Sequence, residues 1–154
     1  MRLWLLRHGQ ATAYVAHGDH LRELTALGRR EAQSAARYLP SSLPLVLTSP
    51  YVRAQQTAAE VMGLLAGRPS LQVQPGITPD DDPRAALQLL QQCAEEEFLV
   101  VCHQPIIGAL AGLLLHGHLQ QPLGFHTGTL MCLEGDMLLA GLMELRAIHH
   151  PDLH

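Results

Sequence analysis

The chain has 154 residues, of which 47% are hydrophobic and 16% are charged, a composition typical of a globular protein rather than a disordered one. Its net charge of -4 argues against nucleic acid as the main partner, because a nucleic acid backbone requires a basic face. All 10 basic residues are arginine, so mechanisms that need a lysine, such as a Walker-type nucleotide site or a Schiff base, are excluded.

The compartment is indicated by the cysteines and by the first residues of the chain. The 3 cysteines are an odd number in a chain too long to need disulfide staples, which favours a reducing compartment. The apolar run at residues 3–6 is too short for a signal peptide or a membrane span. We therefore expect a cytoplasmic protein without membrane contact, folded as a single domain over residues 1–154.

The first half of the chain alternates strand and helix patterns. Residues 3–6 predict a buried first strand, and Thr25 can cap a helix that extends to about residue 39. Residues 43–48 predict a second strand. Ser49 and Pro50 then predict the start of a helix, with the serine as N-cap and the proline at the first helical position.

The pattern continues through the middle of the chain. Residues 71–73 predict a short strand, and Asp82 with Pro83 begins another helix. The uninterrupted apolar run at residues 98–102 is typical of a strand that is covered on both faces. Pro105 then begins an apolar helix that reaches about residue 116.

The last part of the chain predicts a hairpin. Residues 129–133 and 137–142 are the two expected strands, and they flank a turn at residues 134–136. The tail from about residue 147 is expected to fray. The fold class predicted from the whole alternation is α/β, a three-layer sandwich with a mostly parallel central sheet and helices on both faces.

Polar residues of one chemical kind follow three of the predicted strands. Arg7 and His8 follow the first strand, Arg53 lies in the first turn of the helix after the second, and His103 ends the long apolar strand. In open α/β sheets, ligands bind outside the carboxyl ends of the parallel strands. Arginine forks match phosphate oxygens, and helix N-termini favour anions. The sequence therefore predicts a phosphate pocket at this edge.

An imidazole can attack phosphorus and carry the phosphoryl group covalently. His8 is the candidate nucleophile, and Gly9 allows the backbone to turn tightly beneath the ligand. Arg7, Arg53 and His103 would neutralise the charge on the phosphoryl oxygens as the transition state forms. This chemistry needs no metal or cofactor. His116 and His118 have a spacing that suits a metal on a strand, but they follow a helix and are interpreted as loop residues.

Four stretches, taken in order, resemble the motifs of the histidine phosphatase superfamily, whose fold is phosphoglycerate mutase-like. They are Leu6-Arg7-His8-Gly9, the segment from Leu24 to Ala32, the segment from Thr48 to Ala58, and the segment from Val100 to Pro105. Within that superfamily, the short chain and the segment from Ile77 to Pro79 most resemble the SixA-type phosphohistidine phosphatases.

The resemblance implies a role for each matching residue. It makes His8 the phosphorylated nucleophile, with Arg7, Arg53 and His103 as phosphate-binding residues. The backbone of Gln104, directly after the second histidine, would also donate a hydrogen bond to the phosphate.

The general acid is the role with the weakest match. Larger members of the superfamily place a carboxylic acid over the leaving group, and the nearest candidates are Asp80, Asp81 and Asp82. Asp82 is the candidate general acid, with a helix cap as its alternative role. A phosphohistidine substrate tolerates a missing acid, because imidazole leaves more easily than an alkoxide.

Three functions remain open. The leading hypothesis is a metal-independent phosphatase that acts on phosphohistidine in a protein, for which a histidine phosphotransfer domain is a candidate partner. The alternatives are a phosphomonoesterase for a small metabolite and a non-catalytic phosphate-recognition module. The retained nucleophile argues against the last of these, because binding alone does not require one.

Overall fold

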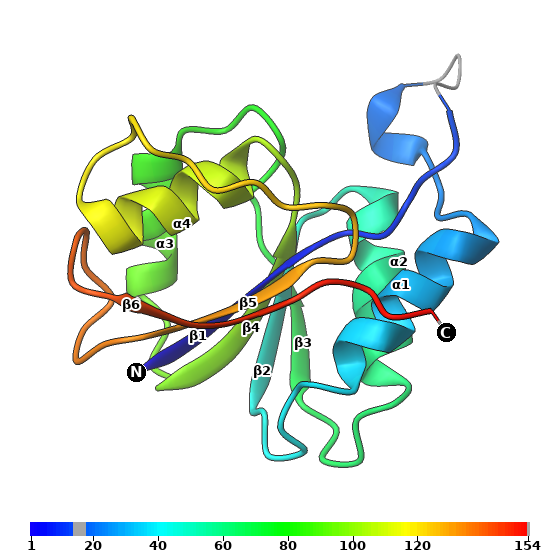
Figure 1. Ribbon diagram of the computed structural model, residues 1–154. Coiled ribbons are helices and arrows are strands. Elements are labelled where there is room, and N and C mark those ends of the chain that lie inside the picture. The colour runs from blue at the N-terminus through cyan, green and yellow to red at the C-terminus, as the bar shows by residue number, and fades with distance from the viewer. Residues whose placement is uncertain (14–17, 154) are drawn as a thin grey trace.

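The computed structural model describes residues 1–13 and 18–153 (Figure 1). Its strands are β1 (Arg2–Arg7), β2 (Leu45–Thr48), β3 (Ser70–Val73), β4 (Glu97–Cys102), β5 (Leu130–Glu134) and β6 (Glu144–His149). Its helices are α1 (Ala26–Ala36), α2 (Val52–Met62), α3 (Pro83–Gln91), α4 (Ile106–His116) and the 3-10 turn η1 (Asp19–Leu21).

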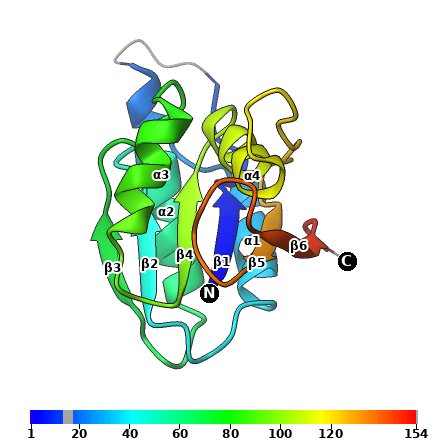
Figure 2. The ribbon, with the colours of Figure 1, turned by 90° about the vertical axis from the view of Figure 1, so that its left-hand side faces the viewer.

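The six strands form one sheet in the order β3-β2-β4-β1-β5-β6 (Figure 2). Strands β1 to β4 are mutually parallel, with β4 between β1 and β2. Strand β5 runs antiparallel to β1, and β6 runs antiparallel to β5. Because β1, β2 and β4 are neighbours and parallel, the residues that follow them emerge together at one edge of the sheet.

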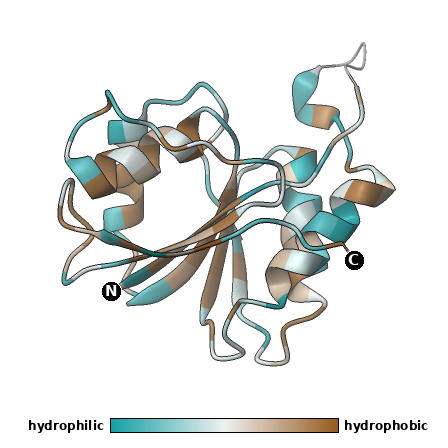
Figure 3. Cartoon of the chain, viewed as in Figure 1, coloured by the Kyte–Doolittle hydropathy of each residue, from teal (hydrophilic) through white to brown (hydrophobic). Residues whose placement is uncertain are grey.

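Helices cover both faces of the sheet, so the predicted three-layer α/β architecture is confirmed (Figures 1 and 3). Successive side chains of a strand point to opposite faces. On β1, Leu3 and Leu5 pack beside α3 and α4, whereas Trp4 and Leu6 pack beside α1 and α2. Burial on both faces explains why β1 and β4 have continuous apolar sequences rather than alternating ones.

The start of α2 differs from the prediction. The helix begins at Val52, and Tyr51 is its N-cap, without a side-chain capping bond. The Ser49 hydroxyl accepts a hydrogen bond from the Tyr51 amide at 3.3 Å and lies 2.6 Å from Nε2 of His103. Ser49 is therefore not the N-cap, and its hydroxyl contacts the histidine that follows β4.

The second strand of the predicted hairpin was also misplaced. Residues 137–142 form turns, and the partner of β5 is β6. The backbone of this segment contacts α4, where the Gly141 amide donates to the Leu113 carbonyl at 3.0 Å and the Met143 amide to Leu114 at 3.1 Å. The backbone amides that a hairpin strand would have paired with β5 are thus bound to α4 instead.

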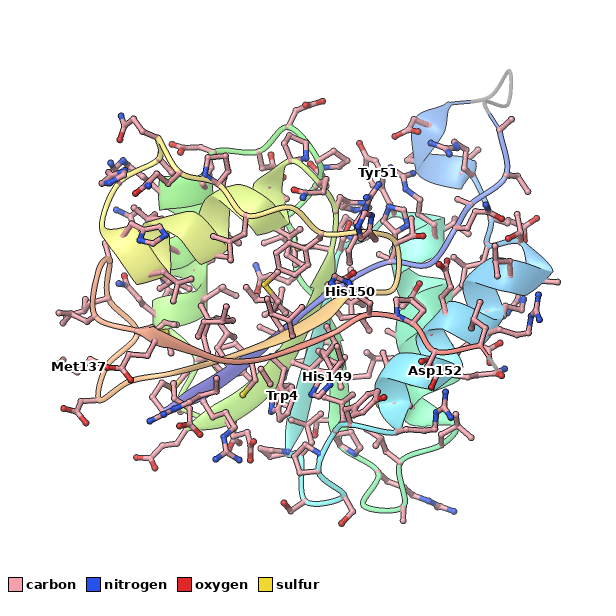
Figure 4. The ribbon with its side chains drawn as sticks, in the orientation of Figure 1. Trp4, Tyr51, Met137, His149, His150 and Asp152 are labelled. Atoms are coloured by element: carbon pink, nitrogen blue, oxygen red, sulfur yellow. The ribbon has the colours of Figure 1, made fainter. Side chains whose placement is uncertain are left out.

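From residue 147 to residue 152 the C-terminal tail is packed against the rest of the chain, so the expectation of fraying was wrong there; the last residue of the tail, 154, lies outside the described residues. The ring of His149, the last residue of β6, stacks on Tyr38 with a centroid distance of 3.9 Å. Beyond it, Nδ1 of His150 lies 2.9 Å from the Thr129 hydroxyl. The Asp152 carbonyl accepts from the Arg37 side chain at 2.6 Å (Figure 4). In the described part of the chain, no helix has the length and apolarity needed to span a bilayer.

Candidate active site

The predicted site residues meet at the carboxyl edge of the parallel strands. Arg7 ends β1 and His8 follows it, held by a hydrogen bond from its amide to the Cys102 carbonyl at 3.0 Å. His103 follows β4, and its ring centroid lies 5.1 Å from that of His8. Arg53, in the first turn of α2, places Nε 3.2 Å from Nε2 of His8. The structure therefore brings together the four side chains that the sequence predicted to meet.

His8 is held in one tautomer. Its Nδ1 lies 2.7 Å from the Gly9 carbonyl, and a carbonyl only accepts, so Nδ1 carries the proton. The remaining nitrogen, Nε2, carries no proton, and its lone pair accepts a hydrogen bond from Arg53 Nε. The Gly9 amide donates to the Thr57 hydroxyl at 3.1 Å, which fixes the turn. An unprotonated, oriented Nε2 is the form of imidazole that attacks phosphorus.

The charge state of His8 favours the same role. Burial, together with the nearby positive charges of Arg53 and Arg7, lowers the pKa of His8 to about 4. The hydrogen bond to the Gly9 carbonyl acts in the opposite direction but is outweighed. At neutral pH the ring is therefore uncharged and available as a nucleophile.

Two glycines, Gly9 and Gly28, let helix α1 approach the backbone that follows His8 closely. A Cβ on Gly9 would lie 2.2 Å from the Gly28 carbonyl oxygen, and a Cβ on Gly28 would lie 2.1 Å from the Gln10 carbonyl oxygen. Any side chain at either position would displace backbone. This contact gives a physical reason for the glycine in the segment from Leu24 to Ala32.

His103 and Arg7 each keep a buried nitrogen without a partner among the described residues. They are Nδ1 of His103 and Nε of Arg7. Burial lowers the pKa of His103 to about 2, so its ring is neutral. The Arg7 guanidinium also donates to the Phe125 carbonyl at 2.7 Å, which fixes its position. Buried polar nitrogens without partners are rare in folded proteins, and two at one site fit a polar ligand such as a phosphoryl group.

The Arg53 guanidinium is bound by Asp19 of η1. It donates to the backbone carbonyl of Asp19 at 2.7 Å and to the Asp19 carboxylate at 2.9 Å. Arg22 donates to the other carboxylate oxygen at 2.9 Å. The hydrogen bonds from Arg22 and Arg53 hold the pKa of Asp19 below its usual range despite partial burial. The Tyr51 ring lies between η1 and the sheet, 5.0 Å from the guanidinium carbon of Arg53 (Figure 4).

Asp19 and Arg22 are functional candidates that sequence reasoning missed. They lie in and just after a single turn of 3-10 helix, where no apolar periodicity or recognised motif marks them. Only the folded structure brings this turn over α2.

These side chains surround a cavity of about 370 Å³. Its lining residues are Arg7, His8, Gln10, Ala11, Asp19, Arg22, Arg53, Pro79, Gln104 and Thr127. Glu31, which is 8% exposed, supports two of its walls, because its carboxylate accepts from the Gln10 amide at 2.7 Å and from the Thr127 hydroxyl at 3.0 Å. A larger hollow of about 600 Å³ lies around Arg2 at the opposite end of β1, but Arg2 is paired there with Glu134 and Glu97. The smaller cavity therefore has the better chemistry for an anion.

Known proteins share this architecture and sequence. The family model described as histidine phosphatase superfamily (branch 1) matches residues 3–77. Phosphohistidine phosphatase SixA of Escherichia coli K12 is 35% identical over 123 residues, which cover 76% of each chain. This chain belongs to the histidine phosphatase superfamily.

Other relatives extend the likeness along most of the chain. A SixA homologue of Haemophilus influenzae is 30% identical over 143 residues, covering 84% of this chain and 85% of that protein. The solved structure of the protein histidine phosphatase SixA in complex with tungstate superposes with a TM-score of 0.82 at 30% identity, covering 98% of this chain and 97% of that one. The predicted family is thus confirmed.

The remaining predicted residues of this histidine phosphatase have different positions. Asp82 is the N-cap of α3, with its carboxylate accepting from the Arg84 amide at 3.0 Å, and it is not part of the cavity lining. Asp81 is engaged with the amide and hydroxyl of Thr78. From this segment Pro79 reaches the cavity, and the carboxylate that lines it is Asp19.

Gln104 lines the cavity, and its side chain donates to the Leu123 carbonyl at 3.2 Å. The hydrogen bond from its backbone to a phosphate stays a prediction. The rings of His116 and His118 lie 6.2 Å apart at the end of α4. Within residues 1–13 and 18–153, no cluster of three or more histidine, cysteine or acidic side chains is arranged to hold a metal.

Proposed function

We propose that this chain is a phosphohistidine phosphatase, which removes a phosphoryl group from a histidine of a protein through a covalent intermediate on His8. The observation that carries the proposal is the state of His8, whose Nδ1–H is bound to the Gly9 carbonyl at 2.7 Å and whose Nε2 is bare, with Arg53 within 3.2 Å. The family and the SixA relatives support the same activity.

In the first step, Nε2 of His8 attacks phosphorus, and the bond between phosphorus and the substrate imidazole breaks. Arg7, Arg53 and Nδ1 of His103 bind the phosphoryl oxygens, where charge accumulates in the transition state. The His8 ring becomes positively charged, and its hydrogen bond to the Gly9 carbonyl stabilises this charge. The substrate imidazole leaves as a neutral ring when its other nitrogen carries a proton.

In the second step, water attacks the phosphorus of the His8 intermediate. The oxygen of water bonds to phosphorus, the bond to Nε2 breaks, and the lone pair returns to the nitrogen. One proton of the water is transferred to a phosphoryl oxygen, so the product leaves as dihydrogen phosphate. The same arginines and His103 stabilise this second transition state, so one pocket serves both steps.

The charge state of Asp19, the carboxylate that lines the cavity, favours phosphohistidine over a phosphate ester as the substrate. Asp19 lines the cavity, and its pKa lies below the usual range because Arg22 and Arg53 bind it. It is ionised at neutral pH and has no proton for a departing alkoxide. An imidazole does not need that proton. A phosphorylated protein, such as a histidine phosphotransfer domain, is therefore the proposed partner, and the three free cysteines support the proposed cytoplasmic location.

The test uses the purified chain with a chelator and no added metal. A protein phosphorylated on histidine and para-nitrophenyl phosphate serve as separate substrates for wild type, His8→Ala and His116→Ala. His116 is exposed at the end of α4, so its variant controls for the loss of a histidine outside the site. We expect faster turnover of the phosphoprotein than of the ester, lost in His8→Ala and kept in His116→Ala. Preference for the ester would contradict the proposal and indicate a metabolite phosphatase.

A further inference from the structure

One buried hydroxyl at the site has no role in the steps above. Ser49 lies between β2 and α2 and is 0% exposed. Its Oγ lies 3.3 Å from the Tyr51 amide nitrogen and 2.6 Å from Nε2 of His103. The amide of Ser49 itself donates to the Val101 carbonyl at 2.9 Å, so the residue is fixed at both its backbone and its side chain.

Among the described residues, the Ser49 hydroxyl has one available hydrogen-bond acceptor, Nε2 of His103. The Tyr51 amide can only donate, so Oγ of Ser49 is the acceptor in that bond. The other partner of Oγ is Nε2 of His103, which accepts in one tautomer of the neutral ring and donates in the other. If Nε2 donated, Oγ would accept twice and its own proton would be buried without an acceptor, which is costly. The hydroxyl therefore donates, and Nε2 is the bare nitrogen.

The expected ligand also favours a proton on Nδ1 of His103. Nδ1 of His103 is buried without a partner in the described residues, in a ring 5.1 Å from that of His8. The oxygens of a phosphoryl group at His8 are acceptors. A protonated Nδ1 attracts them, whereas a bare Nδ1 would direct a lone pair at them.

We infer that Ser49 is a positioning residue that fixes the tautomer of His103, so that the ring presents Nδ1–H to the phosphoryl oxygens. The inference rests on the proposed function, because a phosphoryl group must occupy the space beside His8. The two histidines are then held in the same tautomer but use opposite nitrogens: the Gly9 carbonyl leaves Nε2 of His8 bare for attack, and Ser49 leaves Nδ1 of His103 protonated for binding. The Tyr51 ring, 5.0 Å from the ring of His103, limits its rotation.

The test begins with nitrogen NMR of the histidine rings in the free wild-type protein near neutral pH. We expect a protonated Nδ1 and a bare Nε2 for His103, and the same protonation pattern for His8. In Ser49→Ala the His103 signals should shift toward a mixture of the two tautomers. Ser34→Ala is the matched control, because it removes a serine hydroxyl that is 2% exposed and binds the Asp152 amide.

The kinetic arm uses phosphoprotein turnover. We expect kcat to fall roughly 10- to 100-fold in Ser49→Ala with a smaller change in KM, since the lost hydrogen bond acts mainly on the transition state. Ser49→Thr, which retains a hydroxyl, should recover part of kcat, and Ser34→Ala should match wild type.

A wild-type ring of His103 with its proton on Nε2 would overturn the inference, and so would a Ser49→Ala variant with unchanged tautomer and kcat. The NMR measurement on wild type needs neither a substrate nor a folded variant. An inactive wild type whose His103 is protonated at Nδ1 would refute the proposed function and leave the tautomer assignment intact.

Discussion

Acidification below pH 6.5 is predicted to destabilise the fold through His8. In the unfolded chain the imidazole has its ordinary pKa of 6.5, whereas burial lowers the pKa of His8 in the folded protein to about 4. Each pKa difference of one corresponds to about 1.4 kcal/mol between the two protonation states. The difference of about 2.5 therefore makes protonation of folded His8 unfavourable by about 3 kcal/mol, an order-of-magnitude value.

The direction of the effect follows from which state binds the proton. Above pH 6.5 neither state binds it, and the contribution to stability is fully present. As the pH falls toward about 4, the unfolded chain gains a proton that the folded protein lacks, so the free energy of unfolding decreases. His103, whose pKa is lowered to about 2, acts in the same direction and extends the loss to lower pH.

Urea unfolding between about pH 7 and about pH 4 checks this prediction in wild type and in His8→Asn, which cannot titrate. The variant should lose less stability than wild type over this range, by up to about 3 kcal/mol. The same substitution at exposed His116 is the control and should preserve the wild-type dependence. Identical pH dependence in His8→Asn and wild type would refute the argument, as would an NMR titration of His8 near 6.5.

The remaining predictions concern the loops around the cavity. Asp19→Asn removes a negative charge that pairs with Arg53, so the affinity for inorganic phosphate in titration calorimetry should rise roughly 3- to 10-fold; weaker binding would show that Asp19 mainly holds the arginine in place. Gly28→Ala should lower the free energy of unfolding by about 1–3 kcal/mol in urea, because its Cβ would meet the Gln10 carbonyl oxygen at 2.1 Å. Gly63→Ala, whose Cβ would have ordinary contacts from 3.5 Å, is the control, and equal stability of the two variants would contradict the packing argument.

The layered fold and the four central residues were predictable because both depend on local signals. Continuous apolar runs mark β1 and β4 as strands buried on both faces, and parallel strands bring the residues after them to one edge. Arg7 ends such a strand, and His8 and His103 directly follow one, so their meeting needed no knowledge of distant contacts.

The parts that were missed depend on tertiary partners. Ser49 carries a real capping signal, but its hydroxyl binds His103, which follows β4. Asp19 reaches Arg53 across 34 positions of the sequence, and nothing local marks that pairing. The apolar segment 137–142 resembles a strand, yet contacts with α4 give it turns and leave the pairing with β5 to β6.

The measurement that tests the central claim most directly is trapping of the phosphorylated enzyme. Wild type would be mixed with a protein carrying a radiolabelled phosphoryl group on histidine, quenched in alkali within one turnover, digested and sequenced by mass spectrometry. The account predicts an acid-labile phosphoryl group on His8, absent from His8→Ala and present in His116→Ala. Turnover of the substrate without label on His8, or with label on another residue, would contradict the account.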